Sequence, residues 1–151
     1  PLSESSIIYC TDCHASNGTA PAGPHGSIYP SILKLNYETA DYTVESAQAY
    51  ELCYSCHLRS EYTTDSGDEV RTDVHFTHVV DEDTPCNACH DPHGISDLQG
   101  NTANNSHLIN FDVDIVGGRQ GSLPEFQDDG NRAGRCNLRC HGKGHKWKSY
   151  N

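Results

Sequence analysis

One short signature occurs four times in this 151-residue sequence and uses all eight of its cysteines. Two cysteines are separated by two residues in three copies and by three residues in the last, and a histidine follows each pair directly. The four copies are Cys10-Thr11-Asp12-Cys13-His14, Cys53-Tyr54-Ser55-Cys56-His57, Cys86-Asn87-Ala88-Cys89-His90 and Cys136-Asn137-Leu138-Arg139-Cys140-His141. The chain must therefore fold around whatever these four groups bind.

A cysteine pair followed by a histidine is the attachment signature of c-type haem. Zinc sites, redox dithiols and disulfide frameworks also use cysteine pairs, but none of them needs a histidine after every pair. The wider spacing of the fourth copy is expected to need only a slightly wider turn. We therefore predict four covalently attached haem c groups. Their porphyrins are bound by Cys10, Cys13, Cys53, Cys56, Cys86, Cys89, Cys136 and Cys140, and the proximal iron ligands are His14, His57, His90 and His141.

The composition supports a fold built around these groups. Only 34% of the residues are hydrophobic, against about 45–50% in ordinary domains, so the porphyrins are expected to serve as the core. The length fits a single tetrahaem domain covering residues 1–151. We predict a mostly irregular, coil-rich fold with short helices around the haem-binding motifs and few short strands, and a chain that is largely unfolded without haem.

Local patterns give a few further expectations. Residues 43–57 place apolar residues and both cysteines at helical spacing, which predicts a helix. Residues 107–116 alternate apolar and polar residues, which predicts a short strand. Residues 58–71 and 117–134 are expected to be loop, and residues 70–80 fit either an extended or a helical form. The motifs start 43, 33 and 50 residues apart, which indicates repeats of a site and not of a structural unit.

The remaining histidines are candidates for the sixth position on each iron. The sequence contains no methionine, so histidine–methionine ligation is excluded. Four of the six other histidines would make every iron bis-histidine, which favours low potentials and leaves no open position for a substrate. We therefore expect an electron carrier and not an enzyme. The distal candidates are His25, His75, His78, His93 and His107, with His145 as the weaker one.

Charge and sequence ends suggest where such a carrier works. The formal net charge is −11, which argues against a nucleic-acid partner. No run of residues predicts a membrane span or a signal peptide. The sequence begins at Pro1, which suggests a mature form whose signal peptide has been removed. Because haem is attached to such motifs outside the cytoplasm, we expect an extracellular or cell-surface location, with the periplasm as the alternative.

The segments Cys89-His90-Asp91-Pro92-His93-Gly94 and Cys136 to His145 resemble multihaem outer-surface cytochromes of metal-reducing prokaryotes. In size and haem number the chain is most similar to tetrahaem cytochromes that polymerise into extracellular conductive filaments, the OmcE-type cytochrome nanowires. This resemblance implies bis-histidine haems in parallel and T-shaped pairs, with one distal histidine donated by the next subunit. In related filaments that donor often lies three residues after the first motif. Here that position is Asn17, and the nearest candidate is His25.

Three functions are compatible with these residues. The first is long-range extracellular electron transfer by a tetrahaem cytochrome that polymerises into a filament. The second is a monomeric periplasmic tetrahaem shuttle of the cytochrome c3-like type. The third is a multihaem reductase with one open iron, against which the histidine count argues. The expected partners are further copies of the chain, redox partner cytochromes and extracellular acceptors such as metal oxides.

Overall fold

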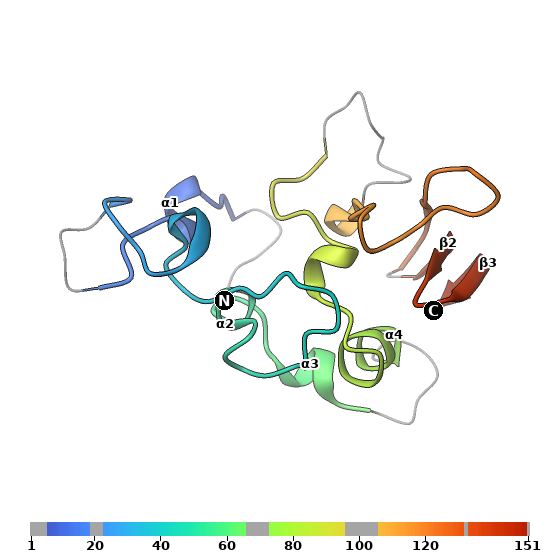
Figure 1. The fold of residues 1–151 in the computed structure, drawn as a ribbon, viewed down its shortest axis with the longest axis horizontal. Coiled ribbons are helices and arrows are strands. Elements are labelled where there is room, and N and C mark those ends of the chain that lie inside the picture. Colours follow the sequence, from blue (N-terminus) through green and yellow to red (C-terminus); the bar gives the residue numbers. More distant parts are fainter. Residues whose placement is uncertain (1–5, 19–22, 66–72, 96–105, 132, 151) are drawn as a thin grey trace.

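The computed structural model describes residues 6–18, 23–65, 73–95, 106–131 and 133–150. Short helical turns and long irregular connections make up most of these residues, and a small antiparallel sheet closes the C-terminal end (Figure 1). In Figure 1 the first helix lies at one end of the molecule, the next three helices group below the centre, and the sheet lies at the other end. The predicted fold class is therefore confirmed.

The helical elements are all one or two turns long, and three of the four motifs lie in or beside them. The α-helical turns are α1 (Cys10–Cys13), α2 (Glu51–Tyr54), α3 (Ser60–Thr63) and α4 (Asp73–His75). A π-helical segment, η2 (Phe76–Asp81), continues α4 directly. The 3₁₀ turns are η1 (Pro30–Ile32), η3 (Cys86–Ala88) and η4 (Ser106–Leu108).

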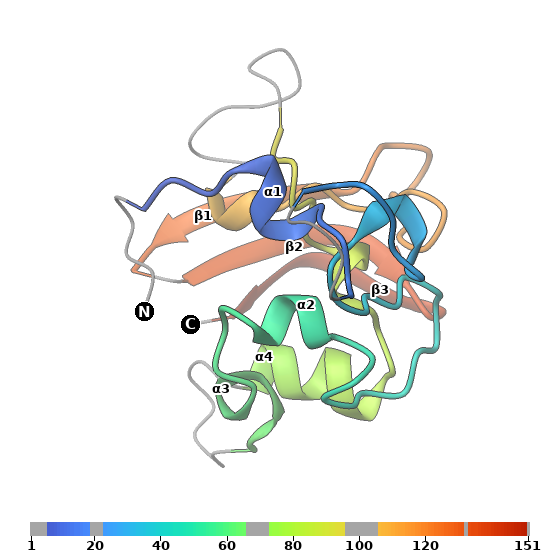
Figure 2. The same cartoon turned by 90° about the vertical axis from the view of Figure 1, so that its left-hand side faces the viewer.

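The sheet has three antiparallel strands in the order β1 (Glu125–Gly130), β2 (Ala133–Cys140) and β3 (Lys143–Tyr150). Both connections are short, so the strands form two consecutive hairpins, and Figure 2 shows the sheet lying above α2, α3 and α4. Phe126 pairs with Cys136, and the register between β2 and β3 shifts between Cys136 and Leu138. Two residues of β3 oppose one of β2 there, which is a β-bulge.

Several local expectations were wrong or too broad. The helix expected over 43–57 is reduced to turns and the four residues of α2, while α3 lies inside the expected loop 58–71. The strand expected over 107–116 is absent, because Asn110 and Asp112 donate their backbone N–H groups to Cys89 and Ala88 of the third motif and form no ladder. The expected loop 117–134 contains β1. In 70–80, the described residues 73–80 are helical.

The buried apolar side chains form two small clusters, and both include haem-motif cysteines. Among the described residues, Ala49, Tyr50 and Val79 form the first cluster, against which Cys53 and Cys86 pack. The second consists of Ala88, Val116 and Leu138, and Cys89, Cys136 and Cys140 pack against it. Clusters of this size provide little hydrophobic stabilisation by themselves, which agrees with a core that haem is expected to complete.

Candidate haem sites

The first and third motifs are built as the same structural unit. In each, the motif histidine forms an isolated bridge with a segment further along the chain, His14 with Leu33 and His90 with Ile109. The Nδ1–H group of each histidine donates to a carbonyl 17 residues ahead, that of Ser31 at 2.7 Å and that of His107 at 2.8 Å. The two sites are therefore matched in backbone and in side-chain contact.

The second half of this unit is a short left-handed turn. Ser31 and Ile32 have φ values of 55° and 56°, and His107 and Leu108 have values of 59° and 58°. Non-glycine residues rarely adopt this conformation, and it persists where surrounding contacts fix it. The expectation that the motifs repeat only a site was therefore wrong for these two.

The fourth motif lies in a strand and not in a turn. Side chains two or four residues apart point to the same face of a strand, whereas residues three apart point to opposite faces. With three residues between them, Cys136 and Cys140 share the inner face of β2 with Leu138, in contact with the second cluster. In a strand, the third residue between the two cysteines is what places both on one face. The expectation of a wider turn at this motif was wrong.

Two histidine pairs join histidines from different parts of the chain. His14 and His93 have ring centroids 6.0 Å apart and ring planes 13° apart. His75 and His90 have centroids 6.1 Å apart and planes 12° apart. His93 follows the third motif but pairs with the histidine of the first, as expected from its position three residues after His90.

These separations can be compared with what an iron between two imidazoles requires. Two metal–nitrogen bonds of about 2 Å each, with about 1 Å from each nitrogen to its ring centre, give roughly 6 Å between centroids. Both pairs meet this value, and their nearly parallel planes suit ligands that face one another across a metal. Because Nδ1 of His14 and of His90 is bonded to a carbonyl, Nε2 of each remains as the iron ligand.

A third pair involves the histidine that sequence reasoning ranked lowest. His78 and His145 have ring centroids 6.0 Å apart, with planes tilted by 41°. Nδ1 of His78 donates to the carbonyl of Val74 at 2.6 Å. His145 lies opposite Leu138 in the ladder, and therefore on the face of β2 that carries the fourth cysteine pair. Its sequence neighbours, lysine and glycine, gave no sign of this.

His141 of the fourth motif is not opposite another histidine in the described part of the chain. Its Nε2–H donates to Asp41 Oδ1 at 2.8 Å, and its ring stacks on Tyr42 with centroids 4.4 Å apart. Ligation by His141, which its position in the motif predicts, would require Nε2 to leave Asp41. The structure thus brings His145, and not His141, to the paired geometry.

The second motif differs again. His57 is exposed, and its Nδ1 lies 3.0 Å from the hydroxyl of Tyr62. Within the described ranges no other histidine ring faces it. His25 and His107 are also exposed and unpaired with other histidines there. The contact that the structure gives to His107 is through its carbonyl, which supports His90, so its role as a distal ligand stays a prediction.

Burial favours the neutral form, which binds metals, at three of the paired histidines, His75, His90 and His145. Desolvation lowers the pKa of His75 to about 4, and it lowers the pKa of His90. The pKa of His145 is lowered first by burial and then by the neighbouring His78. These rings are therefore uncharged at neutral pH and present a free nitrogen lone pair.

Two buried cysteines, Cys89 and Cys136, are held as protonated thiols by their surroundings. Burial raises the pKa of Cys89 to about 12 and that of Cys136 to about 11. All eight cysteines are free of disulfides. In the part of the chain that the structure describes, no three His, Cys, Asp or Glu side chains converge as ligands for a bare metal ion. A zinc site needs three or four such ligands, so these residues do not support the zinc interpretation.

Haem fits the residues better than a bare ion does. Each porphyrin needs one cysteine pair and one or two histidines, and three pairs with iron-compatible spacing are present. The Tyr50 hydroxyl, which belongs to the cluster against which Cys53 and Cys86 pack, is also buried without a hydrogen-bond partner. Buried polar groups normally have partners, and the haem carboxylates are groups that such hydroxyls could meet.

The other three candidate sites, those of the His14–His93 pair, the His78–His145 pair and His57, are each connected to the His75–His90 pair. His93 of the first pair follows His90 by three residues, and His78 of the third pair follows His75 by three residues, so each link spans at most about 10 Å of chain. The second motif is connected without a covalent link. Tyr62, which contacts His57, also lies edge-on against His75 with ring centroids 5.0 Å apart. The candidate iron positions are therefore close to one another.

Comparison with known proteins agrees with this site. Residues 1–61 match the family model of the doubled CXXCH motif. The match covers the first two motifs, and the chain thus carries a multihaem c-type cytochrome motif of the kind that binds haem c covalently and serves electron transfer. No curated protein and no solved structure matched the chain. None of the described helices has the length and apolar character needed to span a bilayer.

Proposed function

We propose that this protein is a tetrahaem c-type cytochrome that carries electrons over long distances outside the cell and polymerises into a conductive filament. The observation that carries the proposal is the set of linked histidine pairs, centred on His75 and His90. Bound haem iron supplies reversible one-electron chemistry. The chain's own residues would hold the four iron positions close together and supply facing nitrogen ligands at three of them.

The axial pairs also support a carrier over an enzyme. His93 opposite His14, and His75 opposite His90, occupy both sides of the position where each metal would be held. A substrate needs an open position on a metal, and these residues leave none at the two sites. Bis-histidine ligation without the thioether of methionine also favours low potentials, which suit the delivery of electrons to external acceptors.

Two exposed histidines support assembly from several copies. His57 faces no other histidine in the described residues, and His25 is exposed on the loop after the first motif. In a filament, His25 of one copy would bind the iron held by His57 of the next. Self-association would also be aided by charge, because seven of the ten basic residues follow Gly118, whereas 18 of the 21 acidic residues precede it.

The test is the variant His25→Ala, with His107→Ala as the matched control. Both remove an exposed histidine that is unpaired within the chain. We expect both variants to keep four covalent haems by mass spectrometry, and only His25→Ala to stop forming filaments seen by electron microscopy of material shed by cells. Unchanged filaments with His25→Ala would remove His25 from this role.

The main alternative is the monomeric periplasmic shuttle, in which a histidine of the same chain would close the His57 site. A monodisperse, low-spin, four-haem protein at every concentration would favour it and overturn the filament. The reductase alternative has one observation in its favour, the missing partner of His57. Binding of carbon monoxide to the purified ferrous protein, with a high-spin signal, would support an open iron there.

A further inference from the structure

We infer that Tyr62 is a positioning residue that sets the redox potential of the iron bound by His57 and connects that site to the one bound by His75. This inference rests on the proposal that haems occupy the second and third motifs. Tyr62 lies in α3, five residues after His57, and its hydroxyl is 3.0 Å from His57 Nδ1. It contacts imidazoles of two different candidate sites.

The ring geometry makes Tyr62 a bridge. Its ring lies perpendicular to that of His57, with centroids 5.7 Å apart and planes at 85°. It lies equally perpendicular to that of His75, with centroids 5.0 Å apart and planes at 89°. Edge-to-face contacts at these distances are favourable for aromatic rings. One side chain therefore fixes the orientation of His57 against a ligand of the neighbouring site.

The hydroxyl of Tyr62 takes the place that a backbone carbonyl has at the other sites. Nδ1 of His14, His90 and His78 lies 2.6–2.8 Å from a carbonyl oxygen. When His57 binds iron through Nε2, its Nδ1–H must donate to the phenol oxygen, which is a weaker acceptor than an amide carbonyl. The longer contact of 3.0 Å agrees with this.

The acceptor on Nδ1–H controls how basic the metal-bound imidazole is. A strong acceptor makes the ligand more basic, which stabilises ferric iron and lowers the potential. A phenol oxygen raises the basicity of the imidazole, and so lowers the potential, less than a carbonyl oxygen does. We therefore expect the iron of His57 to have a higher potential than the irons whose histidines donate to carbonyls, all other contacts being equal.

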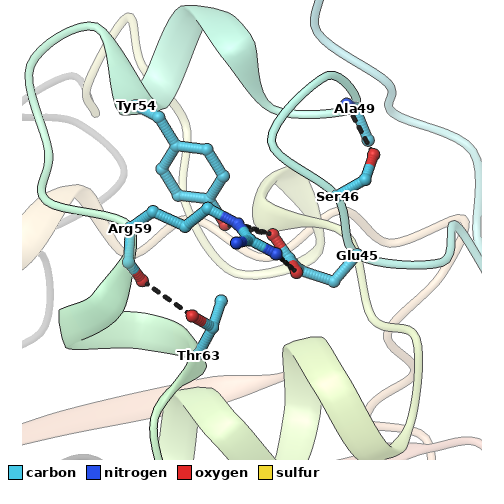
Figure 3. Close-up of polar contacts among 6 residues, drawn as sticks. All are labelled: Glu45, Ser46, Ala49, Tyr54, Arg59 and Thr63. Carbon is cyan, nitrogen blue, oxygen red and sulfur yellow. Dashed lines mark hydrogen bonds and ion pairs between the residues drawn. The ribbon is translucent and has the colours of Figure 1, made fainter.

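The placement of Tyr62 is enforced by contacts in the same segment. The Arg59 guanidinium donates through Nε at 2.9 Å and Nη2 at 2.5 Å to the two carboxylate oxygens of Glu45. Tyr54 Oη donates to the same carboxylate at 3.0 Å, and Thr63 Oγ1 donates to the Arg59 carbonyl at 3.1 Å (Figure 3). The bidentate Arg59–Glu45 contact holds the start of α3 against the chain before α2. His57 and Tyr62 flank Arg59 in the sequence, so this contact fixes the segment that carries both.

The first variant is Tyr62→Phe, which removes only the oxygen and keeps the ring against His75. Without an acceptor, the His57 imidazole becomes less basic, and the potential of that iron rises. In a spectroelectrochemical titration, we expect the midpoint potential of one one-electron step to rise by about 59 mV. For one electron this corresponds to a roughly tenfold change in the ratio of oxidised to reduced haem. The other steps should stay in place.

The second variant is Tyr62→Leu, which also removes the ring. The low-spin ferric electron paramagnetic resonance signals of two haems should then change, because neither His57 nor His75 is held by an aromatic edge. Tyr29→Phe is the matched control, since it removes a tyrosine oxygen from a side chain that faces no histidine ring in the described part of the chain. It should leave every step and signal unchanged.

The outcomes separate this inference from the proposed function. Four covalent haems and a low-spin spectrum in all three variants would uphold haem binding independently of Tyr62. If Tyr62→Phe then shifts no step further than Tyr29→Phe does, the tuning role is wrong while the cytochrome proposal stands. Fewer than four haems in the unmodified protein would instead overturn the proposed function and, with it, this inference.

Discussion

Each histidine that is proposed to bind iron has a second ring nitrogen, and the hydrogen bond of that nitrogen decides how firmly the ring is oriented. His14, His78 and His90 donate through Nδ1 to carbonyls held by the backbone, so their Nε2 atoms are oriented before any metal arrives. His93 is held more weakly. Its Nδ1 lies 3.5 Å from Asp91 Oδ1 and its side chain is 77% exposed. It is the ligand of its pair that depends most on the metal for its position.

Replacing His93 by alanine is expected to leave one iron without a distal ligand and to leave the other irons unchanged. The site of Cys10, Cys13 and His14 would lose its distal ligand, so about one quarter of the haem should become high-spin and bind carbon monoxide. Absorption and electron paramagnetic resonance spectra of the purified protein measure this fraction. Tyr29→Phe, which removes no histidine, is the control and should remain low-spin. A fully low-spin His93→Ala protein would show that a different histidine serves this site.

At the scale of elements, cysteine spacing and secondary structure are matched. The pairs separated by two residues lie on short helical turns, where positions i and i+3 share a face. The pair separated by three residues lies on β2, where positions i and i+4 share a face. The same chemical requirement, two sulfurs directed at one porphyrin edge, is thus met by two kinds of backbone.

This match predicts the effect of shortening the fourth motif. Deleting Arg139 would place the two cysteine side chains on opposite faces of β2, so the fourth haem should not attach through both of them. Intact-protein mass spectrometry should then show the loss of one haem. Arg139→Ala keeps the spacing and removes only an exposed side chain, so it should retain four. Four haems in the deletion variant would mean that this segment becomes a turn when haem is bound.

The sequence was most informative where covalent chemistry dictates it. The four motifs follow from short-range spacing, and the position of His93, three residues after His90, indicated that it faces a different site. It was least informative where the partner is remote. His145 faces His78, 67 positions earlier in the chain, and no local pattern reports such a contact. The alternation over 107–116 was misleading because the third motif takes its backbone hydrogen bonds, a competition that hydrophobic periodicity cannot reveal.

At the scale of the whole molecule, charge is divided along the chain. The sheet and the loop before it carry most of the basic residues, and the helical part is acidic. Two of the basic side chains are neutralised within the chain, Lys143 by Glu82 at 2.6 Å and Arg135 by Asp129 at 2.8 Å. Among the described residues, Arg119, Arg139, Lys146 and Lys148 have no carboxylate within ion-pair distance. If the protein polymerises as proposed, this division of charge would favour end-to-end contact between copies.

Association between copies should accordingly weaken with salt. The Debye length falls from about 10 Å at 0.1 M to about 3 Å at 1 M salt, so the amount of polymer that sediments should decrease over this range. Lys146→Glu should lower it further at 0.1 M, because it reverses a charge on the basic sheet. Lys34→Glu makes the same change of charge in the acidic part and is the control. Equal effects of both variants would exclude specific attraction through the sheet.

The contact between His14 and His93 has a consequence for the stability of the chain. These residues are 79 positions apart, and an iron bound by both would act as a cross-link that closes a loop of that length. In the chain-entropy model, closing such a loop restricts the unfolded chain by roughly 4.5 kcal/mol at 25 °C. Unlike a disulfide, this link does not break when thiols are kept reduced. The protein would owe part of its resistance to unfolding to the same bonds that hold its irons.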